Sequence, residues 1–492
     1  MKDWVPKPHQ EHGVKFMLER GCAGLFIPPG FGKTTISLAV HKLLREHDQV
    51  RRTLVICPKN PMFGVWPVEV QKWNDFHDIG VEVLHGSDKD EKLARLDPHK
   101  QLYVINFDGL KWLIARIAEM KTFPFEMLIV DESAHMRDTN TLRFKLLKPL
   151  LSLFKRRYIL TGDPAPNSLI DLFGQMYIMD RGATFGPFIT HFRNKYFNAT
   201  GYGGYTFIPK ENTDKEIRAA LAPRVYTLTE EDQKGLPPIT YNTIEFEFSQ
   251  QTRHAYAQFK RKLKHDFPSG DSITAKNMGV LTNMLQQFTG GAVYNTEHQW
   301  EWVHDEKLEV LEELIRERQG RPTVIVYRFN HELERMLKLF GKDTPHFGGK
   351  MGVVELVEKW NAGDIPILLA QEQSMSFGLN MQEVEAAIVW FYITASNERY
   401  RQLIRRVYRT GQKYPVVVHH LVAKHTWDER GLSILAIKDR QQSDLLSALR
   451  EYWRNELAQE SGTKTASKAR RAPIATTRAR IPVARAAAPR TR

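Results

Sequence analysis

The sequence predicts an α/β protein built from two tandem parallel-sheet domains. Three observations lead to this fold class: a length of 492 residues, short apolar β-rich runs that alternate with helix-like segments, and the return of that rhythm late in the chain. The length suffices for two or three domains with cores of ordinary size. Strands separated by helices are joined by right-handed crossovers, which build parallel sheets.

The expected strands fall into two groups. The first group is 23–27, 53–57, 102–106, 127–130 and 158–161, and the second is 323–327, 367–370, 387–391 and 416–422. Between the groups lie aromatic and basic stretches, a helix-like run at 251–264 and a Leu-Pro-Pro break at 236–238. We therefore expect a first domain at 1–179, a partly helical inserted region at 180–302, a second domain at 303–456 and a tail at 457–492.

The tail carries most of the excess positive charge. The formal net charge is +13, and residues 461–492 hold nine Lys/Arg and no acid. Such a charge indicates a polyanionic partner. The segment is rich in Ala, Arg, Pro and Thr and has too little apolar surface to offset its ordering entropy, so we expect it to be disordered. It serves either as a solubilising extension or as a non-specific phosphate-binding arm.

No apolar run approaches the roughly 18 residues of a membrane span, and the N-terminus lacks a signal-peptide pattern. We therefore expect a soluble cytoplasmic protein with no membrane partner. Cys22 and Cys57 both lie in apolar, strand-like runs. This setting favours small buried hydrophobes over metal ligands or disulfide partners.

The segment 30–35, Gly-Phe-Gly-Lys-Thr-Thr, stands between the first strand and a helical apolar pattern. This context is typical of a phosphate-binding loop, in which backbone N–H groups and a helix N-terminus face phosphate oxygens. Lys33 would reach the β- and γ-phosphates, and Thr34 would ligate Mg²⁺. The full motif has glycine where Ile27 stands, so an ordinary glycine turn is the alternative. We expect ATP and Mg²⁺ as cofactors, held by Gly30, Gly32, Lys33, Thr34 and Thr35.

An apolar strand at 125–130 ends in Asp131 and Glu132. Acids at the carboxyl end of a parallel strand face the crevice where ligands bind. Asp131 would hold Mg²⁺, and Glu132 would orient or deprotonate the attacking water. The alternative is a solvated acidic turn with no function. The phosphate loop about a hundred residues earlier makes this alternative less favoured.

A third group of polar residues lies at Gln402, Arg406 and Arg409. Their spacing of i, i+4 and i+7 places them on one face of a helix. The face is either a solvated basic surface or a set of arginine fingers that stabilise transition-state charge. Because these residues belong to the second domain, hydrolysis would require the two domains to close on one nucleotide.

These three groups, in this order, resemble superfamily II helicases, and the sequence between them is similar to the Swi/Snf-like DNA translocases of compact phage or prokaryotic type. Lys7-Pro8-His9-Gln10 resembles the family's entry motif, in which Gln10 would read adenine. The motif at 376–380 contains Gly378, which would touch both ligands. The segment 406–412 matches the family's arginine-finger ending. The resemblance implies two RecA-like domains, the second being the helicase C-terminal domain.

Further segments carry the same resemblance. Residues 54–58 with Trp66, Glu69 and Trp73 resemble a motif on the nucleic-acid track, and 160–167 resembles the motif that couples ATP to nucleic acid. Two positions depart from the family pattern. Ala134 stands where histidine is usual, with His135 next to it, and Asp163 stands where threonine is usual. The first departure puts the usual link between the ATP site and the Asp163 loop in question.

The function expected from these features is a nucleic-acid-stimulated ATPase that translocates on or remodels DNA. Its catalytic residues would be Lys33, Glu132, Gln402, Arg406 and Arg409. The resemblance implies duplex or forked DNA as partner, with RNA open, and a monomer in a prokaryotic or phage-infected cell. One alternative is a strand-separating DNA or RNA helicase. The other is a non-catalytic nucleic-acid-binding protein with a decayed ATP site, motivated by Ile27, Ala134 and Asp163.

The region between the domains contains basic and aromatic residues that suit stacking and charge contacts with nucleic acid. Local packing of the aromatic side chains is the alternative. The residues in question are Arg193, Lys195, Tyr196, Tyr202 and Tyr205.

Overall fold

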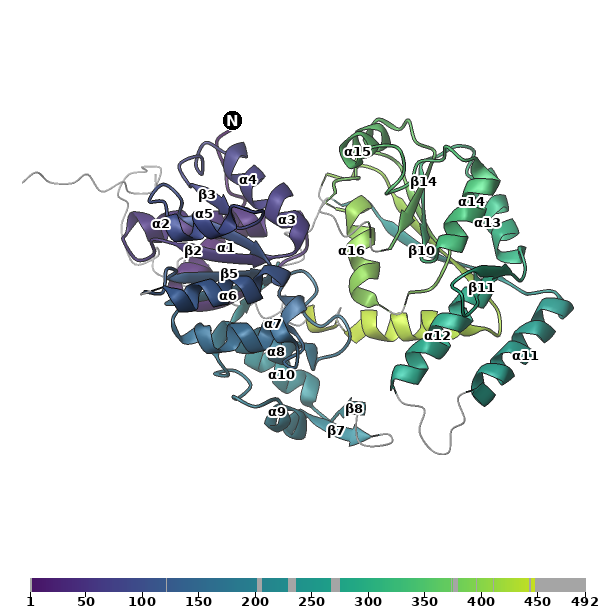
Figure 1. Ribbon diagram of the computed structural model, residues 1–492, viewed down its shortest axis with the longest axis horizontal. Helices are drawn as coiled ribbons and strands as arrows, with labels where there is room; N and C mark the ends of the chain where they lie inside the picture. The colour runs from purple at the N-terminus through teal and green to yellow at the C-terminus, as the bar shows by residue number, and fades with distance from the viewer. Residues whose placement is uncertain are drawn as a thin grey trace, which may run out of the picture.

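Two parallel β-sheets organise the chain, one in each of two lobes that lie side by side in the computed structural model (Figure 1). The structure describes residues 2–120, 122–200, 206–228, 236–266, 275–372, 374, 379–394, 396–409, 411–441 and 444–446. The tail, expected to begin at 457, lies outside these residues. No helix of the described part of the chain is long and apolar enough to cross a membrane.

The sheet of the first lobe has seven parallel strands among the described residues. Side chains alternate between its faces, so Leu54 and Ile56 enter one core while Val55 and Cys57 enter the other. Because helices cover both faces, the strands read as continuous apolar runs in the sequence. In spatial order the strands are β3 (Val81–Val83), β4 (Leu102–Asn106), β2 (Thr53–Cys57), β5 (Met127–Asp131), β6 (Arg156–Thr161), β1 (Cys22–Phe26) and β9 (Val225–Tyr226).

Helices cover both faces of this sheet. One face carries α1 (Pro8–Glu19), α2 (Lys33–Glu46), α3 (Lys59–Gly64) and α4 (Trp66–Lys72). The other face carries α5 (Lys89–Arg95), α6 (Leu110–Glu119), α7 (Leu142–Leu147), α8 (Asp171–Asp180), α9 (Ile189–Tyr196) and α10 (Thr213–Leu221).

The second lobe repeats the plan with five parallel strands among its described residues. Helix α15 (Val353–Ala362) and helix α16 (Asn397–Val407) pack on one face, and α13 (Glu306–Glu317) and α14 (Asn330–Phe340) on the other. The strand order is β10 (Ile239–Phe246), β16 (Val416–Ala423), β15 (Ala387–Trp390), β13 (Thr323–Tyr327) and β14 (Ile367–Gln371). The two lobes confirm the predicted fold class, and each of the nine expected strands is present to within two residues at either end.

Segments of the region 180–302 pack into both lobes. Phe192 of α9 and Ile217 of α10 lie in the core of the first lobe, and β9 joins its sheet. Strand β10 instead pairs with β16 in the second sheet. Its residues are mostly exposed, which is why no apolar run announces this edge strand. The remaining pieces are α11 (Gln250–Asp266), α12 (Ala275–Thr289), the antiparallel pair β7 (Phe197–Thr200) and β8 (Thr206–Pro209), and the pair β11 (Ala292–Tyr294) and β12 (Trp300–Trp302).

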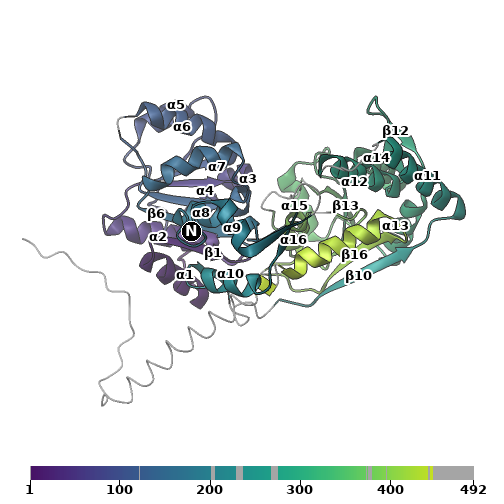
Figure 2. The ribbon, with the colours of Figure 1, turned by 90° about the horizontal axis from the view of Figure 1, so that it is seen from below.

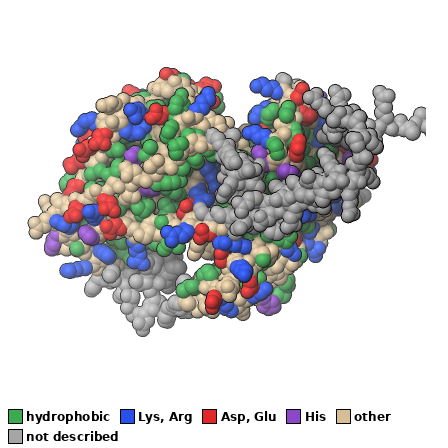
Figure 3. Space-filling view, turned by 180° about the vertical axis from the view of Figure 1, so that it is seen from behind, with side chains coloured by type: hydrophobic (Ala, Val, Ile, Leu, Met, Phe, Trp, Pro, Cys, Tyr) green, Lys and Arg blue, Asp and Glu red, His purple; other side chains and the backbone are tan. Residues whose placement is uncertain are grey.

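Three neighbouring strands of the first sheet, β5, β6 and β1, end at the edge that faces the second lobe. The acids follow β5, Asp163 follows β6 and the phosphate loop follows β1. Helix α16 lies on the side of the second lobe that faces the first, as the views in Figures 1 and 2 show. Seen from behind, a hollow separates the lobes, and Lys and Arg side chains are visible inside it (Figure 3).

Candidate nucleotide site between the lobes

A cavity of about 1530 Å³ lies between the lobes and is lined by residues of both. From the first lobe it takes Gln10, the loop 29–35 and the acids Asp131 and Glu132. From the second lobe it takes Gln402, Arg406 and Arg409. The structure therefore brings together residues that lie up to about 400 positions apart in the sequence.

The phosphate loop has the backbone that its glycines predict. Gly30 and Gly32 have φ values of 88° and 86°, a region that side-chain-bearing residues rarely adopt. Gly32 is the residue before α2, so the loop runs directly into a helix N-terminus. A Cβ on Gly32 would lie 2.1 Å from Gln10 Nε2. Gln10 of α1 thus lies against the loop, and its Oε1 accepts the backbone N–H of Lys7 at 2.9 Å.

Ile27 stands where the usual motif has glycine, and the structure gives a physical reason why it is accommodated. Its φ is not positive, and its side chain is fully buried in a core cluster of the first lobe. Lys33 Nζ donates a hydrogen bond to the Ile27 carbonyl at 2.8 Å. Burial lowers the pKa of Lys33, although Glu132 and Asp131 lie close enough to favour its charged form.

The two threonines of the loop have different surroundings. Thr35 is buried, and its Oγ1 donates to the Gly32 carbonyl at 2.9 Å, so it holds the first turn of α2. Thr34 is half-buried and lines the cavity. Thr34 is therefore the hydroxyl that is placed to ligate a cation, and Thr35 supports the loop.

Of the acids at the end of β5, Asp131 is buried and Glu132 is half-buried, and both line the cavity. Asp131 Oδ1 accepts the backbone N–H of Glu132 at 3.0 Å. Burial raises the pKa of Asp131, and it raises the pKa of Glu132 to about 7, while Lys33 opposes both shifts. Glu132 has a φ of 52°, an uncommon conformation for a residue with a side chain. A carboxyl group with a pKa near neutrality suits proton transfer at physiological pH.

Trp66 lies behind the acids. Its indole Nε1 donates to Asp131 Oδ2 at 3.2 Å, and Trp66 is fully buried. The resemblance had placed this tryptophan on the nucleic-acid track, but a side chain with no exposed surface cannot touch nucleic acid in this structure. Glu69 and Trp73, from the same motif, line the cavity, and Trp73 Nε1 donates to Glu69 Oε2 at 2.8 Å.

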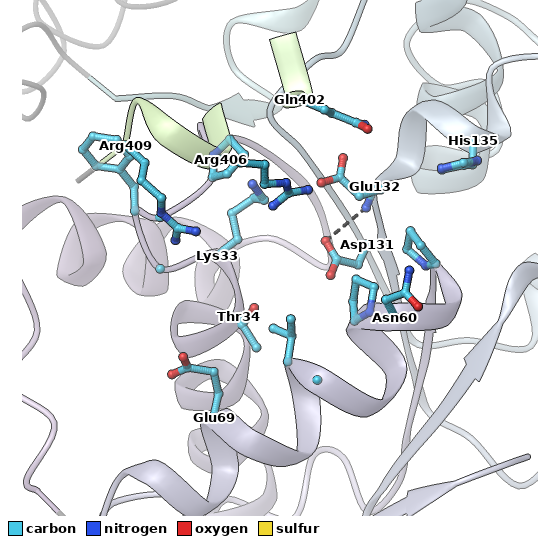
Figure 4. Close-up of a pocket in the computed structure, with 18 of the residues that line it drawn as sticks. Lys33, Thr34, Asn60, Glu69, Asp131, Glu132, His135, Gln402, Arg406 and Arg409 are labelled. Carbon is cyan, nitrogen blue, oxygen red and sulfur yellow. Dashed lines mark hydrogen bonds between the residues drawn. The ribbon is translucent and has the colours of Figure 1, made fainter. Parts of the chain in front are cut away.

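The second lobe supplies the arginines. Figure 4 shows Arg406 near Lys33 and Glu132, and Arg409 over the phosphate loop. A Cβ on Gly30 would lie 3.2 Å from Arg409 Nη2, so this guanidinium lies directly beside the loop. Arg409 Nη1 also donates to Asn380. Burial lowers the pKa of Arg406 to about 10, while Glu132 favours its charged form.

The expectation that Gln402, Arg406 and Arg409 share one helix face is wrong for Arg409. Helix α16 ends at Val407, and Tyr408 has φ −100° and ψ 89°, outside the helical region. The chain therefore leaves the helix axis before Arg409, and this turn carries Arg409 toward Gly30. Gln402 and Arg406 remain one helical turn apart and both line the cavity.

Three further positions named in the sequence analysis are Gly378, Ala134 and Asp163. Gly378 lies outside the described residues. Ala134 is buried, and the neighbouring His135 lines the cavity with its ring 4.9 Å from that of Phe107. Asp163 faces the second lobe, where its Oδ2 accepts a hydrogen bond from Arg405 Nη1 at 2.6 Å.

Of the five residues suggested to contact nucleic acid by stacking and charge, three lie among the described residues. Tyr196 is buried in the core of the first lobe, which matches the local-packing alternative. The Arg193 guanidinium lies 4.7 Å from the centre of the Phe207 ring, and Lys195 Nζ lies 4.7 Å from that of Tyr196. The other two candidates, Tyr202 and Tyr205, lie outside the described residues.

The described residues fit ATP and Mg²⁺. The loop that lines the cavity contains two positive-φ glycines, and the buried Nε of Arg409 has no hydrogen-bond partner among the described residues. Phosphate oxygens are the acceptors that such a donor lacks. Thr34 and Asp131 offer the oxygen ligands that Mg²⁺ prefers. ATP would be held by Gln10, Gly30, Gly32 and Lys33 on one side and by Arg406 and Arg409 on the other.

Two parallel-sheet lobes with a phosphate loop, paired acids and opposing arginines at their interface define a two-lobed ATPase of the helicase type. Comparison with known proteins places it more closely, because the family model of the SNF2-related domain matches residues 9–290. The chain belongs to the SNF2-related family of ATPase and helicase-like motors.

The chain is also similar to individual proteins. "Putative protein p41" of Acyrthosiphon pisum secondary endosymbiont phage 1 is 30% identical over 466 residues, covering 92% of this chain and 100% of its own. "Putative ATP-dependent helicase/translocase YwqA" of Bacillus subtilis is 22% identical over 480 residues, and the match spans 50% of its length. A solved Sulfolobus solfataricus SWI2/SNF2 ATPase core in complex with dsDNA is 20% identical, with a TM-score of 0.42, covering 94% of this chain and 96% of its own.

Proposed function

We propose that this protein hydrolyses ATP with Mg²⁺ and uses the cycle to move along DNA, with duplex DNA as the track. One observation carries the proposal: arginines of the second lobe line the same cavity as the phosphate loop and the acids of the first, and Arg409 lies beside Gly30. A site shared between two lobes links hydrolysis to their relative movement. Membership of the SNF2-related family supports the same function, an ATP-hydrolysing motor.

The candidate catalytic residues have separate roles in this proposal. Bound ATP and Mg²⁺ supply the phosphoanhydride bond and a divalent charge at its oxygens. Glu132 would accept a proton from the attacking water, which its raised pKa suits. Lys33, Arg406 and Arg409 would offset the negative charge that develops on the phosphoryl oxygens. Gln402, on the same helix as Arg406, would orient the water or the phosphate.

Movement along DNA follows from repeated closing and opening of the lobes around this site. Contacts to the phosphate backbone do not depend on base sequence, so binding should be salt-sensitive and sequence-tolerant. Full-length similarity to a phage protein supports a phage or prokaryotic setting, and we propose a cytoplasmic monomer. RNA and forked DNA remain alternatives as substrates that the experiment below compares.

The test is phosphate release by the wild-type protein with no nucleic acid, single-stranded DNA, duplex DNA, forked DNA and RNA. We expect duplex DNA to stimulate turnover and Lys33→Ala and Glu132→Gln each to abolish it. Matched controls are Lys15→Ala and Glu119→Gln, which change exposed residues away from the cavity. Absence of turnover in the folded wild type under every condition would favour the non-catalytic binding protein.

A second pair of assays separates translocation from strand separation. Displacement of a triplex-forming strand without unwinding of a forked duplex supports translocation on duplex DNA. Unwinding of the fork supports the helicase alternative, which uses the same ATP residues. If RNA stimulates turnover more than DNA does, RNA replaces DNA as the proposed partner.

A further inference from the structure

Gln175 joins two loops of the first lobe. It lies on α8 with a fully buried side chain. Its Oε1 accepts a hydrogen bond from Ser133 Oγ at 2.8 Å, and its Nε2 donates to the Pro164 carbonyl at 2.6 Å. Ser133 directly follows Glu132, and Pro164 directly follows Asp163. One amide therefore bridges the loop after the acids and the loop after β6.

The second of these loops reaches the other lobe. Asp163 is almost fully buried, and its Oδ2 accepts from Arg405 Nη1 at 2.6 Å, while Arg401 Nη1 lies 4.0 Å from its Oδ1. Arg401 and Arg405 are one turn apart on α16, the helix that also carries Gln402 and Arg406. The carboxylate thus holds the arginine helix against the first lobe.

Both contacts of Gln175 are buried, so breaking either one is costly. Separating Gln175 from either loop would leave a buried polar group unpaired, which costs more than a typical hydrogen bond contributes. A shift of the acids is therefore expected to move Pro164 and Asp163, and with them the ion pair to Arg405. Ala134, which directly follows Ser133, has no polar side-chain atom that could make this link.

We propose that Gln175 and Asp163 form one connection that couples the catalytic acids of the first lobe to the arginine helix of the second. Both are positioning residues, because neither lines the cavity, and they act through Ser133 and Arg405. The inference rests on the proposed ATPase function. It explains how the acids and phosphate loop of the first lobe are aligned with the arginines of the second. It also assigns a role to Asp163.

The test is a double-mutant cycle on DNA-stimulated ATP turnover. Gln175→Leu removes the amide at similar size, and Asp163→Asn keeps the shape and removes the charge. We expect each variant to lower kcat about tenfold with KM for ATP changed less than about twofold, because alignment and not ATP binding is lost. The double variant should be no slower than the slower single variant, because both changes break the same connection.

A second contact between the lobes provides the control. Arg137 Nη1 lies 2.7 Å from Glu398 Oε2, and neither residue touches Gln175 or Asp163 through a described hydrogen bond. Combining Glu398→Gln with Gln175→Leu should multiply the two single effects. Multiplicative effects in the Gln175→Leu/Asp163→Asn pair as well would overturn the single connection.

Stability is measured in parallel, since Gln175 is buried. If Gln175 only supports the fold, Gln175→Leu will lower Tm and leave kcat unchanged, and the inference fails. If Gln175→Leu does not fold, Ser133→Ala removes only the hydroxyl partner and should lower kcat in the same way; an unchanged kcat would again reject the connection. A wild-type protein without turnover would reject the proposed function itself, whereas an active wild type with unaffected variants rejects only this inference.

Discussion

The indole Nε1–H of Trp66 donates a hydrogen bond to Asp131 Oδ2 at 3.2 Å, and both side chains are buried. The contact fixes the orientation of the carboxylate that is expected to hold Mg²⁺. Groups that orient a metal ligand from behind affect metal affinity strongly. We therefore predict that Trp66→Phe, which keeps an aromatic ring and removes the donor, raises the Mg²⁺ concentration for half-maximal turnover about tenfold.

The matched control is Trp73→Phe, which removes an indole donor to Glu69 and leaves Asp131 untouched. Its Mg²⁺ requirement should stay close to that of the wild type. Equal Mg²⁺ curves for Trp66→Phe and the wild type would show that the indole contributes only to packing.

Turnover should depend on pH through Glu132, because burial raises its pKa to about 7. The carboxyl group accepts a proton only when ionised, so kcat/KM should rise as pH increases through about 7 and then level off. Measurement between about pH 5.5 and 8.5 checks this prediction. A flat profile across that range would exclude Glu132 as the base whose ionisation limits the rate.

The same shift predicts the direction of a stability change. A folded-state pKa above the model value of 4.5 means that the folded protein binds this proton more tightly than the unfolded chain does. Stability from this group is therefore present at low pH and is lost as pH rises from about 4.5 through 7. Glu132→Gln cannot ionise, so its Tm should exceed that of the wild type at pH 8, with a smaller difference at pH 5.

Gly32 should tolerate no side chain. Its φ of 86° is unfavourable for other residues, and an added Cβ would lie 2.1 Å from Gln10 Nε2. Gly32→Ala should abolish ATP binding and lower the unfolding free energy by about 1–2 kcal/mol. Gly279→Ala is the control, because Gly279 lies within α12 with nothing near its added Cβ. Fluorescent-nucleotide binding and urea denaturation measure both effects, and nucleotide binding by Gly32→Ala would contradict the prediction.

Lys307 and Asp428 form a buried ion pair in the second lobe. Lys307 Nζ lies 2.6 Å from Asp428 Oδ2, and each side chain is 1% exposed. Lys307→Met leaves a buried carboxylate without its cation, so the unfolding free energy should fall by about 3–5 kcal/mol. The exposed pair Lys350–Asp343 is the control, and Lys350→Met should leave urea denaturation unchanged. Equal denaturation curves for the two variants would contradict the prediction.

The described structure agrees with the sequence most closely where one physical signal acts locally. The apolar strands, the glycines at 30 and 32, and the acids after β5 are each recognisable because local backbone geometry and periodicity require those residue types. Strand β10 gives no such signal, because it lies at a sheet edge with most residues exposed. Only its pairing with β16 assigns it to the second lobe.

The sequence by itself predicted the fold class, the phosphate loop and the described candidate residues that line the cavity from both lobes. Only the tertiary structure decided how they meet. It ended α16 before Arg409 so that this arginine reaches Gly30, buried Trp66 behind Asp131, and placed Gln175 between two loops. Hydrogen bonds between residues 42 or 242 positions apart depend on packing of whole elements, and no local pattern of residues encodes them.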